Sequence, residues 1–188
     1  LIDCGANVEC TPEYLLQFAY MGSFYCQKQM KIASPRIGLI NNGAEESKGT
    51  PMIKETYGLL KQAGEAGRLN FVGNIEGRDV PFGMADVILC DGFTGNVLLK
   101  STEGVIKYMM KQLKGVFYKS TKNKLAAAAL KGDFMEMKDS LDVNKIGGTA
   151  LLGISRPVIK AHGSSNEEAI FSAIRQAVAF ARAGVIDE

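Results

Sequence analysis

Apolar stretches followed by glycine and small polar residues recur along this chain. The stretches are "LID", "RIGLI", "LNFVG", "ADVILC" and "PVI", and they end in "CGAN", "NNG", "GNIEG", "CDGFTGN" and "AHGSSN". Amphipathic helical patterns separate most of them, and this alternation predicts a layered α/β fold. Ligands of open α/β sheets bind at the carboxyl ends of the strands, so the same pattern predicts the edge that carries a site.

Two helices are expected in the first part of the chain. Thr11, Pro12 and Glu13 have the order of a helix start, with a hydroxyl N-cap, a proline and an acid in the first turn. The residues that recur at helical spacing after them, and that we expect to face the core, are Leu15, Phe18, Ala19, Gly22 and Cys26. A second helix is predicted over roughly 51 to 66.

The segment 95–140 interrupts the strand–helix rhythm and predicts two successive helices. The apolar positions at helical spacing are Ile106, Met109, Met110, Leu113 and Phe117 in the first, and Leu130, Phe134, Met137 and Leu141 in the second. Such a hairpin can cross a dimer interface. Its lysine-rich tip can also rest on an anionic membrane, and the expected contact residues are Leu125, Ala126, Ala129 and Leu130. Both interpretations can hold together.

Composition excludes several classes of function. A net charge of +2 over 188 residues is too small to indicate nucleic acid as the main partner, and no apolar run is long enough to span a bilayer. One histidine and four cysteines without a CxxC pair make a dedicated metal site improbable, and we expect no cofactor. Free thiols are typical of a cytoplasmic protein. The P-loop, dinucleotide-binding and G-x-S-x-G motifs are absent.

The stretch "ADVILCDGFTGNVLLK", residues 85–100, predicts a strand, a sharp turn and a helix start. Asp91 and Thr94 are residues that often cap a turn through hydrogen bonds of their own side chains. The functional alternative is that Asn96 and nearby N–H groups hold an oxygen that develops negative charge. Lys100 follows Asn96 by about one helical turn, so the two can share a face.

The stretch "KAHGSSN", residues 160–166, contains the only histidine, His162. Ser165 and Glu168 fit the capping box S-x-x-E, which is a purely structural device. Gly163 and Ser164 beside a helix N-terminus also form a plausible phosphate cradle, next to a histidine that can donate a proton. The residues alone leave both interpretations open.

Taken together, these motifs resemble those of the bacterial phosphate acyltransferases of phospholipid synthesis, the PlsX family. The similar stretches run in family order and cover nearly the whole chain: "DCGANVECTPEYLLQFAYMGS", "NFVGNIEGRD", "ADVILCDGFTGNVLLK", "KLAAAALK" and "PVIKAHGSSN". The resemblance implies a three-layer α/β/α sandwich like that of isocitrate and isopropylmalate dehydrogenases and of phosphotransacetylase. The hairpin at about 95–140 would protrude from it.

The resemblance also implies that residues 1–188 are the carboxyl-terminal part of a single domain. The chain has no initiator methionine and begins within an apolar run, and the "DAMGGD"-like motif that family members carry upstream is absent. We therefore expect these residues to belong to a longer protein.

The reaction that the resemblance implies is transfer of a fatty acyl group from acyl carrier protein to inorganic phosphate, which gives acyl phosphate. The expected catalytic residues are His162, Asn96 and Lys100. The expected substrate-binding residues are Asn7, Asp91, Gly92, Gly163, Ser164 and Ser165. Phosphate would attack the thioester directly, so the protein mainly positions the reactants and stabilises charge.

The partners implied are acyl carrier protein, a second copy of the chain in a homodimer, an anionic membrane surface at the inner face of the membrane, and a downstream glycerol-3-phosphate acyltransferase. The carrier protein is acidic, so basic residues are docking candidates: Lys119, Lys122, Lys124, Arg156 and Lys160. Two alternatives remain. One is a phosphotransacetylase-like enzyme that uses acyl coenzyme A, and the other is a non-catalytic, membrane-associated scaffold that binds the carrier protein.

Overall fold

The computed structural model describes residues 1–141, 148–161, 163 and 165–183. The chain divides into two compact units, which hold Leu1–Lys100 and Ser101–Arg182.

The first unit is built on a parallel sheet. Its strands are β1 (Arg36–Asn41), β2 (Asn70–Glu76) and β3 (Val87–Leu89), in the order β2-β1-β3. The predicted strands "RIGLI", "LNFVG" and "ADVILC" are thereby confirmed. The run "LID" adds to the outer side of β3 through a parallel bridge between Ile2 and Leu89. All carboxyl ends of these parallel segments therefore lie at one edge of the sheet.

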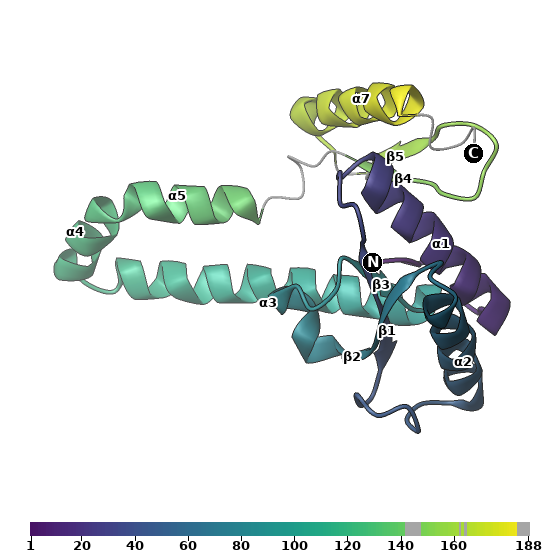
Figure 1. Cartoon of the computed structure of the whole chain (residues 1–188). Helices are drawn as coiled ribbons and strands as arrows, with labels where there is room; N and C mark the ends of the chain where they lie inside the picture. Colours follow the sequence, from purple (N-terminus) through teal and green to yellow (C-terminus); the bar gives the residue numbers. More distant parts are fainter. Residues whose placement is uncertain (142–147, 162, 164, 184–188) are drawn as a thin grey trace. The chain divides into compact units, whose positions relative to one another are not determined.

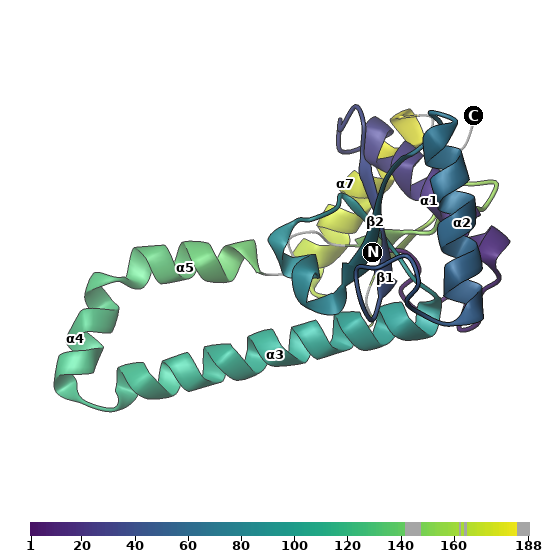
Figure 2. The ribbon, with the colours of Figure 1, turned by 60° about the horizontal axis from the view of Figure 1, so that its bottom comes forward.

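Two helices cover one face of this sheet (Figures 1 and 2). Helix α1 (Pro12–Lys28) begins as predicted, because the Thr11 hydroxyl accepts the Tyr14 N–H at 3.3 Å. Helix α2 (Pro51–Glu65) begins in the same way at Thr50. The core between helices and sheet consists of Leu15, Ala19, Cys26, Ile37, Leu39, Leu60, Ala63, Leu69, Val87 and Leu89. A short 3-10 helix, η1 (Gly77–Phe82), links β2 to β3.

The amino ends of β1 and β3 are joined by an ion pair between Arg36 and Asp86. The guanidinium Nη2 and Nε donate to the two carboxylate oxygens at 2.9 and 3.0 Å, and the Arg36 backbone N–H donates to Asp86 at 2.8 Å. The Arg36 side-chain hydrogen bond, followed by the backbone one, holds the pKa of Asp86 below its ordinary value. This contact fixes the edge of the sheet opposite the carboxyl ends.

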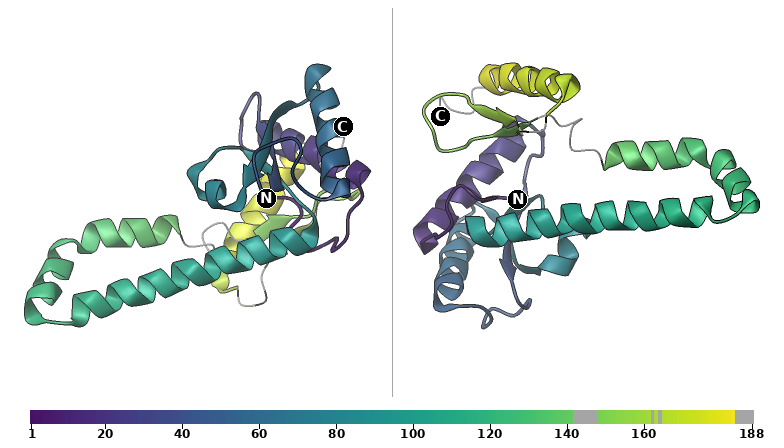
Figure 3. Two further views of the ribbon diagram at one scale, coloured as in Figure 1. Left: turned by 90° about the horizontal axis from the view of Figure 1, so that it is seen from below. Right: turned by 180° about the vertical axis from the view of Figure 1, so that it is seen from behind.

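The helical segment contains three helices rather than the predicted two. Helix α3 (Gly92–Tyr118) begins in the first unit and continues into the second, and α4 (Thr121–Ala129) and α5 (Lys131–Ser140) follow. Leu130 is the C-cap of α4 and therefore separates two helices instead of belonging to one. In the second unit α5 runs back alongside α3 (Figures 1 and 3). Among the helices in the described residues, none has the length and hydrophobicity to cross a bilayer.

The second unit ends in a small antiparallel pair of strands, β4 (Gly148–Ala150) and β5 (Ile159–Ala161), packed against α7 (Glu167–Arg182). The predicted strand "PVI" thus begins two residues late. Its partner β4 was not predicted, and their pairing is antiparallel. The mixed α/β class with a parallel sheet is confirmed, whereas the three-layer sandwich and the single-domain assignment stay predictions.

Candidate functional site

Asp3 organises the loop that follows the first strand segment. Its side chain is buried, with 7% exposure, and its Oδ1 accepts the backbone N–H groups of Gly5 and Ala6 at 2.9 and 3.0 Å. Oδ2 accepts the backbone N–H of Asn7 and, at 3.1 Å, the Asn7 side-chain amide. Successive N–H groups that converge on one point form an anion-binding nest. Here the anion is the chain's own carboxylate.

Asp3 stays ionised despite its burial. Burial raises the pKa of a carboxyl group, but the hydrogen bonds from the loop more than compensate and leave the pKa of Asp3 below its ordinary value. These donors are the backbone N–H groups of Ala6, Asn7 and Gly5 and the Asn7 amide. The loop is therefore fixed by a charge at neutral pH.

The turn after β3 lies directly against this loop. The Asp3 N–H donates to the Cys90 carbonyl at 2.9 Å, and the Gly92 N–H donates to the Asn7 carbonyl at 2.8 Å. A Cβ on Gly92 would lie 2.5 Å from the Asn7 carbonyl oxygen, and one on Gly95 would collide with the Asp3 carbonyl oxygen. Only glycine permits this approach at both positions. The predicted residues Asn7 and Gly92 are thus brought together.

Asp91 caps the first turn of α3. Its Oδ1 accepts the Thr94 N–H at 2.7 Å and its Oδ2 accepts the Thr94 hydroxyl at 2.8 Å. This is the structural alternative considered for the two residues. The substrate-binding role of Asp91 stays a prediction. Both of its carboxylate oxygens already accept hydrogen bonds from Thr94.

Asn96 reaches from α3 back to the first loop. Its Nδ2 donates to the Cys4 carbonyl at 3.2 Å, across Gly5, whose φ of +124° suits glycine. Asn96 and Asn7 are both exposed, and each amide nitrogen has two hydrogens, of which the hydrogen bond described uses one. Lys100 is exposed one turn further along α3. The first unit thus gathers Asn7, Asp91, Gly92 and Asn96 at the carboxyl edge of the sheet.

The remaining predicted residues belong to the second unit. Gly163 is exposed with open space at its Cβ position, and Ser165 is half-buried. His162 and Ser164 lie outside the described residues. The predicted capping box is wrong, because the Asn166 side chain caps α7 by accepting the Ala169 N–H at 3.0 Å. Ser165 is therefore not the N-cap.

The cysteines near the site are poor nucleophiles. All four are free, Cys26 and Cys90 are buried, and Cys4 and Cys10 are half-buried. Burial, followed by the negative charge of Asp91, raises the pKa of Cys90 to about 12, and burial also raises the pKa values of Cys4 and Cys10. These thiols stay protonated at neutral pH. No cluster of three metal-binding side chains occurs in the described part of the chain.

Sequence reasoning missed two features of this edge. Asp3 had a local signal, since an acid directly before "CGAN" can accept the N–H groups of the following turn. The loop after β1 is the second feature: Asn41 Nδ2 donates to the Lys48 carbonyl at 3.2 Å, and Asn74 Nδ2 to the Glu45 carbonyl at 2.9 Å. The Asn74 side-chain oxygen is buried without a hydrogen-bond donor among the described residues.

Comparison with known proteins identifies the family. A family model described as "Fatty acid synthesis protein" matches residues 1–188. The chain is 50% identical over 177 residues to the phosphate acyltransferase of Oceanobacillus iheyensis, and 51% identical over 176 residues to those of Bacillus thuringiensis (strain Al Hakam) and Bacillus mycoides (strain KBAB4). Each match covers 94% of this chain and 52% of the relative, so the chain spans about half the length of these curated relatives. The chain belongs to the fatty acid synthesis protein family, as its resemblance to the PlsX phosphate acyltransferases predicted.

Proposed function

We propose that these residues act in an acyltransferase that moves a fatty acyl group from acyl carrier protein to inorganic phosphate and releases acyl phosphate. The observation that carries this proposal is the 50% identity, over 94% of the chain, to a protein named phosphate acyltransferase. Because the chain covers 52% of that relative, the proposal concerns the whole protein to which these residues contribute.

The reaction needs positioning and charge stabilisation. A phosphate oxygen attacks the thioester carbonyl carbon, and the carbonyl oxygen becomes an oxyanion. When this intermediate collapses, the carbon–sulfur bond breaks and the leaving thiolate takes up a proton. Donors placed at the oxyanion before the reaction lower the barrier. No acyl-enzyme is required, in keeping with the raised pKa of the Cys90 thiol, which makes it a poor nucleophile.

The residues of the first unit suit the oxyanion. Asn96 in the first turns of α3 and Asn7 in the loop after the first strand segment present exposed amides, and Asp3 and the two glycines hold this loop against the start of the helix. The second hydrogen of each amide can donate to a substrate oxygen, and Lys100 contributes a positive charge on the same helix as Asn96. We propose that the Asn96 amide donates to the thioester carbonyl oxygen as it becomes an oxyanion. The Asn7 amide donates to an oxygen of the bound substrate before the reaction.

The phosphate and the leaving group are assigned to the loop before α7. Gly163, Ser164 and Ser165 would cradle phosphate near the positive end of this helix, and His162 would donate to the leaving sulfur or to the oxyanion. Phosphate is a competent nucleophile once it is oriented, so binding it beside the thioester supplies much of the catalysis.

The hairpin is proposed to serve association. An apolar stripe on α3 is exposed at Val105 (57%), Tyr108 (62%), Met109 (64%) and Val116 (55%), and it suits the interface of a homodimer. The expected membrane-contact residues of the tip, Leu125, Ala126, Ala129 and Leu130, are all exposed. So are the basic candidates for carrier-protein docking: Lys119, Lys122, Lys124, Arg156 and Lys160. We propose a cytoplasmic protein bound peripherally to the inner face of the membrane, where acyl phosphate can pass to a glycerol-3-phosphate acyltransferase.

The proposal is tested by a choice of substrates. The full-length protein that contains these residues is given phosphate with either acyl carrier protein thioester or acyl coenzyme A, and thioester loss is followed. Faster turnover of the carrier thioester supports the proposal. Preference for the coenzyme A thioester would identify a phosphotransacetylase-like enzyme. Carrier binding without turnover of either thioester would identify a scaffold.

A further inference from the structure

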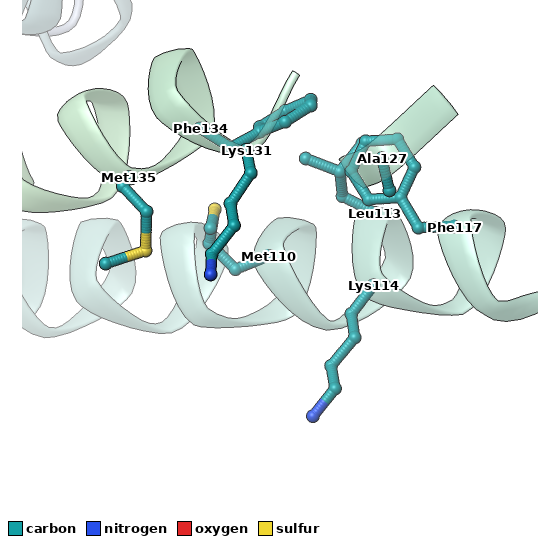
Figure 4. Close-up of a pocket in the computed structure, with 8 residues that line it drawn as sticks. All are labelled: Met110, Leu113, Lys114, Phe117, Ala127, Lys131, Phe134 and Met135. Atoms are coloured by element: carbon teal, nitrogen blue, oxygen red, sulfur yellow. The ribbon is translucent and has the colours of Figure 1, made fainter. Parts of the chain in front are cut away.

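An apolar groove of about 200 Å³ runs between α3 and the helices α4 and α5 of the second unit (Figure 4). Its floor consists of Met110, Leu113, Phe117, Phe134 and Met135, and Ala127 of α4 closes one end. Phe117 and Phe134 meet edge to face, with ring centroids 4.7 Å apart. This aromatic pair holds α5 against α3 and leaves the rest of the groove open.

The hairpin does not fill this groove with its own side chains. Between residues 101 and 140 no residue with a described side chain is fully buried, and the floor residues are half-buried or exposed. Met135 keeps 48% of its surface exposed. Covering these exposed apolar side chains with an apolar ligand removes them from water and lowers the free energy.

The groove lies in a strongly positive part of the chain. Between Gly104 and Gly132 the sequence contains no acidic residue and carries these lysines: Lys107, Lys111, Lys114, Lys119, Lys122, Lys124 and Lys131. Lys131 lines the groove and extends from its helix toward α3, whereas Lys114 points away from it (Figure 4). Among the described residues no carboxylate forms an ion pair with Lys131.

We propose that this groove binds the hydrocarbon chain of a single-chain anionic amphiphile, with the anionic head group beside Lys131. An apolar floor with a cationic rim is complementary to a fatty acyl chain that ends in a carboxylate or phosphate. This site goes beyond the acyl transfer proposed above and does not depend on it.

A second copy of the hairpin fits the groove less well. It would bring the same excess of lysines against Lys131, and like charges held together oppose association. The exposed stripe at Val105, Met109 and Val116 lies roughly a quarter of a turn around α3 from the groove residues Met110 and Phe117. That stripe therefore remains available to a second copy when the groove is occupied.

The test is calorimetric titration of the chain with dodecyl phosphate below its micelle-forming concentration. Saturable binding is expected with one molecule per chain. Butyl phosphate, which keeps the head group but lacks the chain, is expected to bind at least tenfold more weakly. Dodecyltrimethylammonium, with the same chain and the opposite charge, is also expected to bind more weakly.

Two pairs of variants locate the site. Ala127→Trp fills the groove and is expected to weaken binding about tenfold or more, whereas Ala128→Trp, an exposed position on the same helix, leaves it unchanged. Lys131→Gln is expected to weaken the binding of dodecyl phosphate about fivefold. Lys122→Gln, outside the groove, is expected to have little effect on binding. Circular dichroism shows whether Ala127→Trp disturbs the helices of the hairpin. If it does, Lys131→Gln still tests the proposal.

Equal binding by Ala127→Trp and Ala128→Trp in folded chains would overturn the proposal. Equal binding of dodecyl phosphate and dodecyltrimethylammonium would do the same, because it would identify nonspecific adsorption. Light scattering provides the third readout. If Ala127→Trp shifts the monomer–dimer balance and no ligand saturates the chain, the occupant is a second copy.

Discussion

The carboxylate of Asp3 accepts both the backbone N–H and the side-chain amide of Asn7, four residues further along the chain. The same carboxylate takes the N–H groups of Gly5 and Ala6, so a single buried charge sets the path of the loop. Since the Asn7 carbonyl in turn accepts the Gly92 N–H, Asp3 also determines how this loop meets the turn that carries Asn96.

Asp3→Asn is expected to destabilise the chain. Asparagine keeps the size of the side chain but replaces one acceptor with an amide donor, which faces the two donors of Asn7. Leaving such buried groups unsatisfied costs about 1–3 kcal/mol. Urea denaturation measures the loss, and hydrogen exchange should accelerate at the Gly5, Ala6 and Asn7 amides. Glu9→Gln removes an exposed carboxylate nearby and serves as the control. Unchanged exchange in Asp3→Asn would contradict the proposed role of the carboxylate.

Two glycines of α3 should respond in opposite directions to alanine. Gly95→Ala places a methyl group against the Asp3 carbonyl oxygen and Cys90 Sγ, so the chain loses stability or the site loops separate. Gly104 has open space at its Cβ position, so Gly104→Ala should stabilise the chain by roughly 0.5–1 kcal/mol. The midpoints of thermal unfolding of the two variants measure these changes in stability. A Gly95→Ala chain as stable as Gly104→Ala would show that the close contact is not required.

The Arg36–Asp86 ion pair predicts a defined pH dependence. The folded-state pKa of Asp86 lies below its ordinary value of 3.8, so the stability it contributes is present above that value and is lost as pH falls through the folded pKa. Asp86→Asn should therefore be less stable than wild type above about pH 5, and the difference should close at lower pH. Urea denaturation of both proteins at neutral and acid pH measures this difference in stability. A difference that stayed constant down to acid pH would exclude the ion pair as its source.

The hairpin tip makes a separate prediction about membranes. Leu125 and Leu130 are exposed by 69% and 45%, so replacing both with glutamate adds negative charge without disturbing a core. The double variant should no longer co-sediment with anionic vesicles and should keep its activity in solution, since the charge now opposes the lipid surface. Ile170→Glu with Ile174→Glu, two exposed positions of α7, is the matched control. Vesicle binding retained by the tip variant and lost by the control would move the anchor to α7.

The periodic elements could be predicted from sequence because their signals are local. The Thr11 cap, the core face at Leu15 and Ala19 and the buried strand "RIGLI" each depend on neighbours a few residues away, and each prediction is confirmed. The division of 95–140 was less accessible. Leu130 continues the apolar period of the following helix, yet it ends α4. Met109 has core spacing and is 64% exposed, because helical spacing does not say which face finds a partner.

Part of the site was predictable for the same reason and part was not. Parallel strands place their carboxyl ends at one edge, so the approach of Asn7 to the turn at Gly92 follows from the fold class. The role of Asp3 depends on four donors that converge only in the folded loop. The capping box at Ser165 failed because Asn166, which is also a strong N-cap residue, occupies the next position.

The central proposal, acyl transfer to phosphate with Asn96 and His162 as catalytic residues, is tested most directly by acyl phosphate formation in the full-length protein that contains these residues. Acyl phosphate is trapped with hydroxylamine while the released carrier thiol is counted. We predict equal amounts of the two products, strict dependence on phosphate, and losses of about a hundredfold or more in Asn96→Ala and His162→Ala but not in the exposed-helix control Gln112→Ala. Thiol release without phosphate, or wild-type acyl phosphate formation in both site variants, would contradict the account.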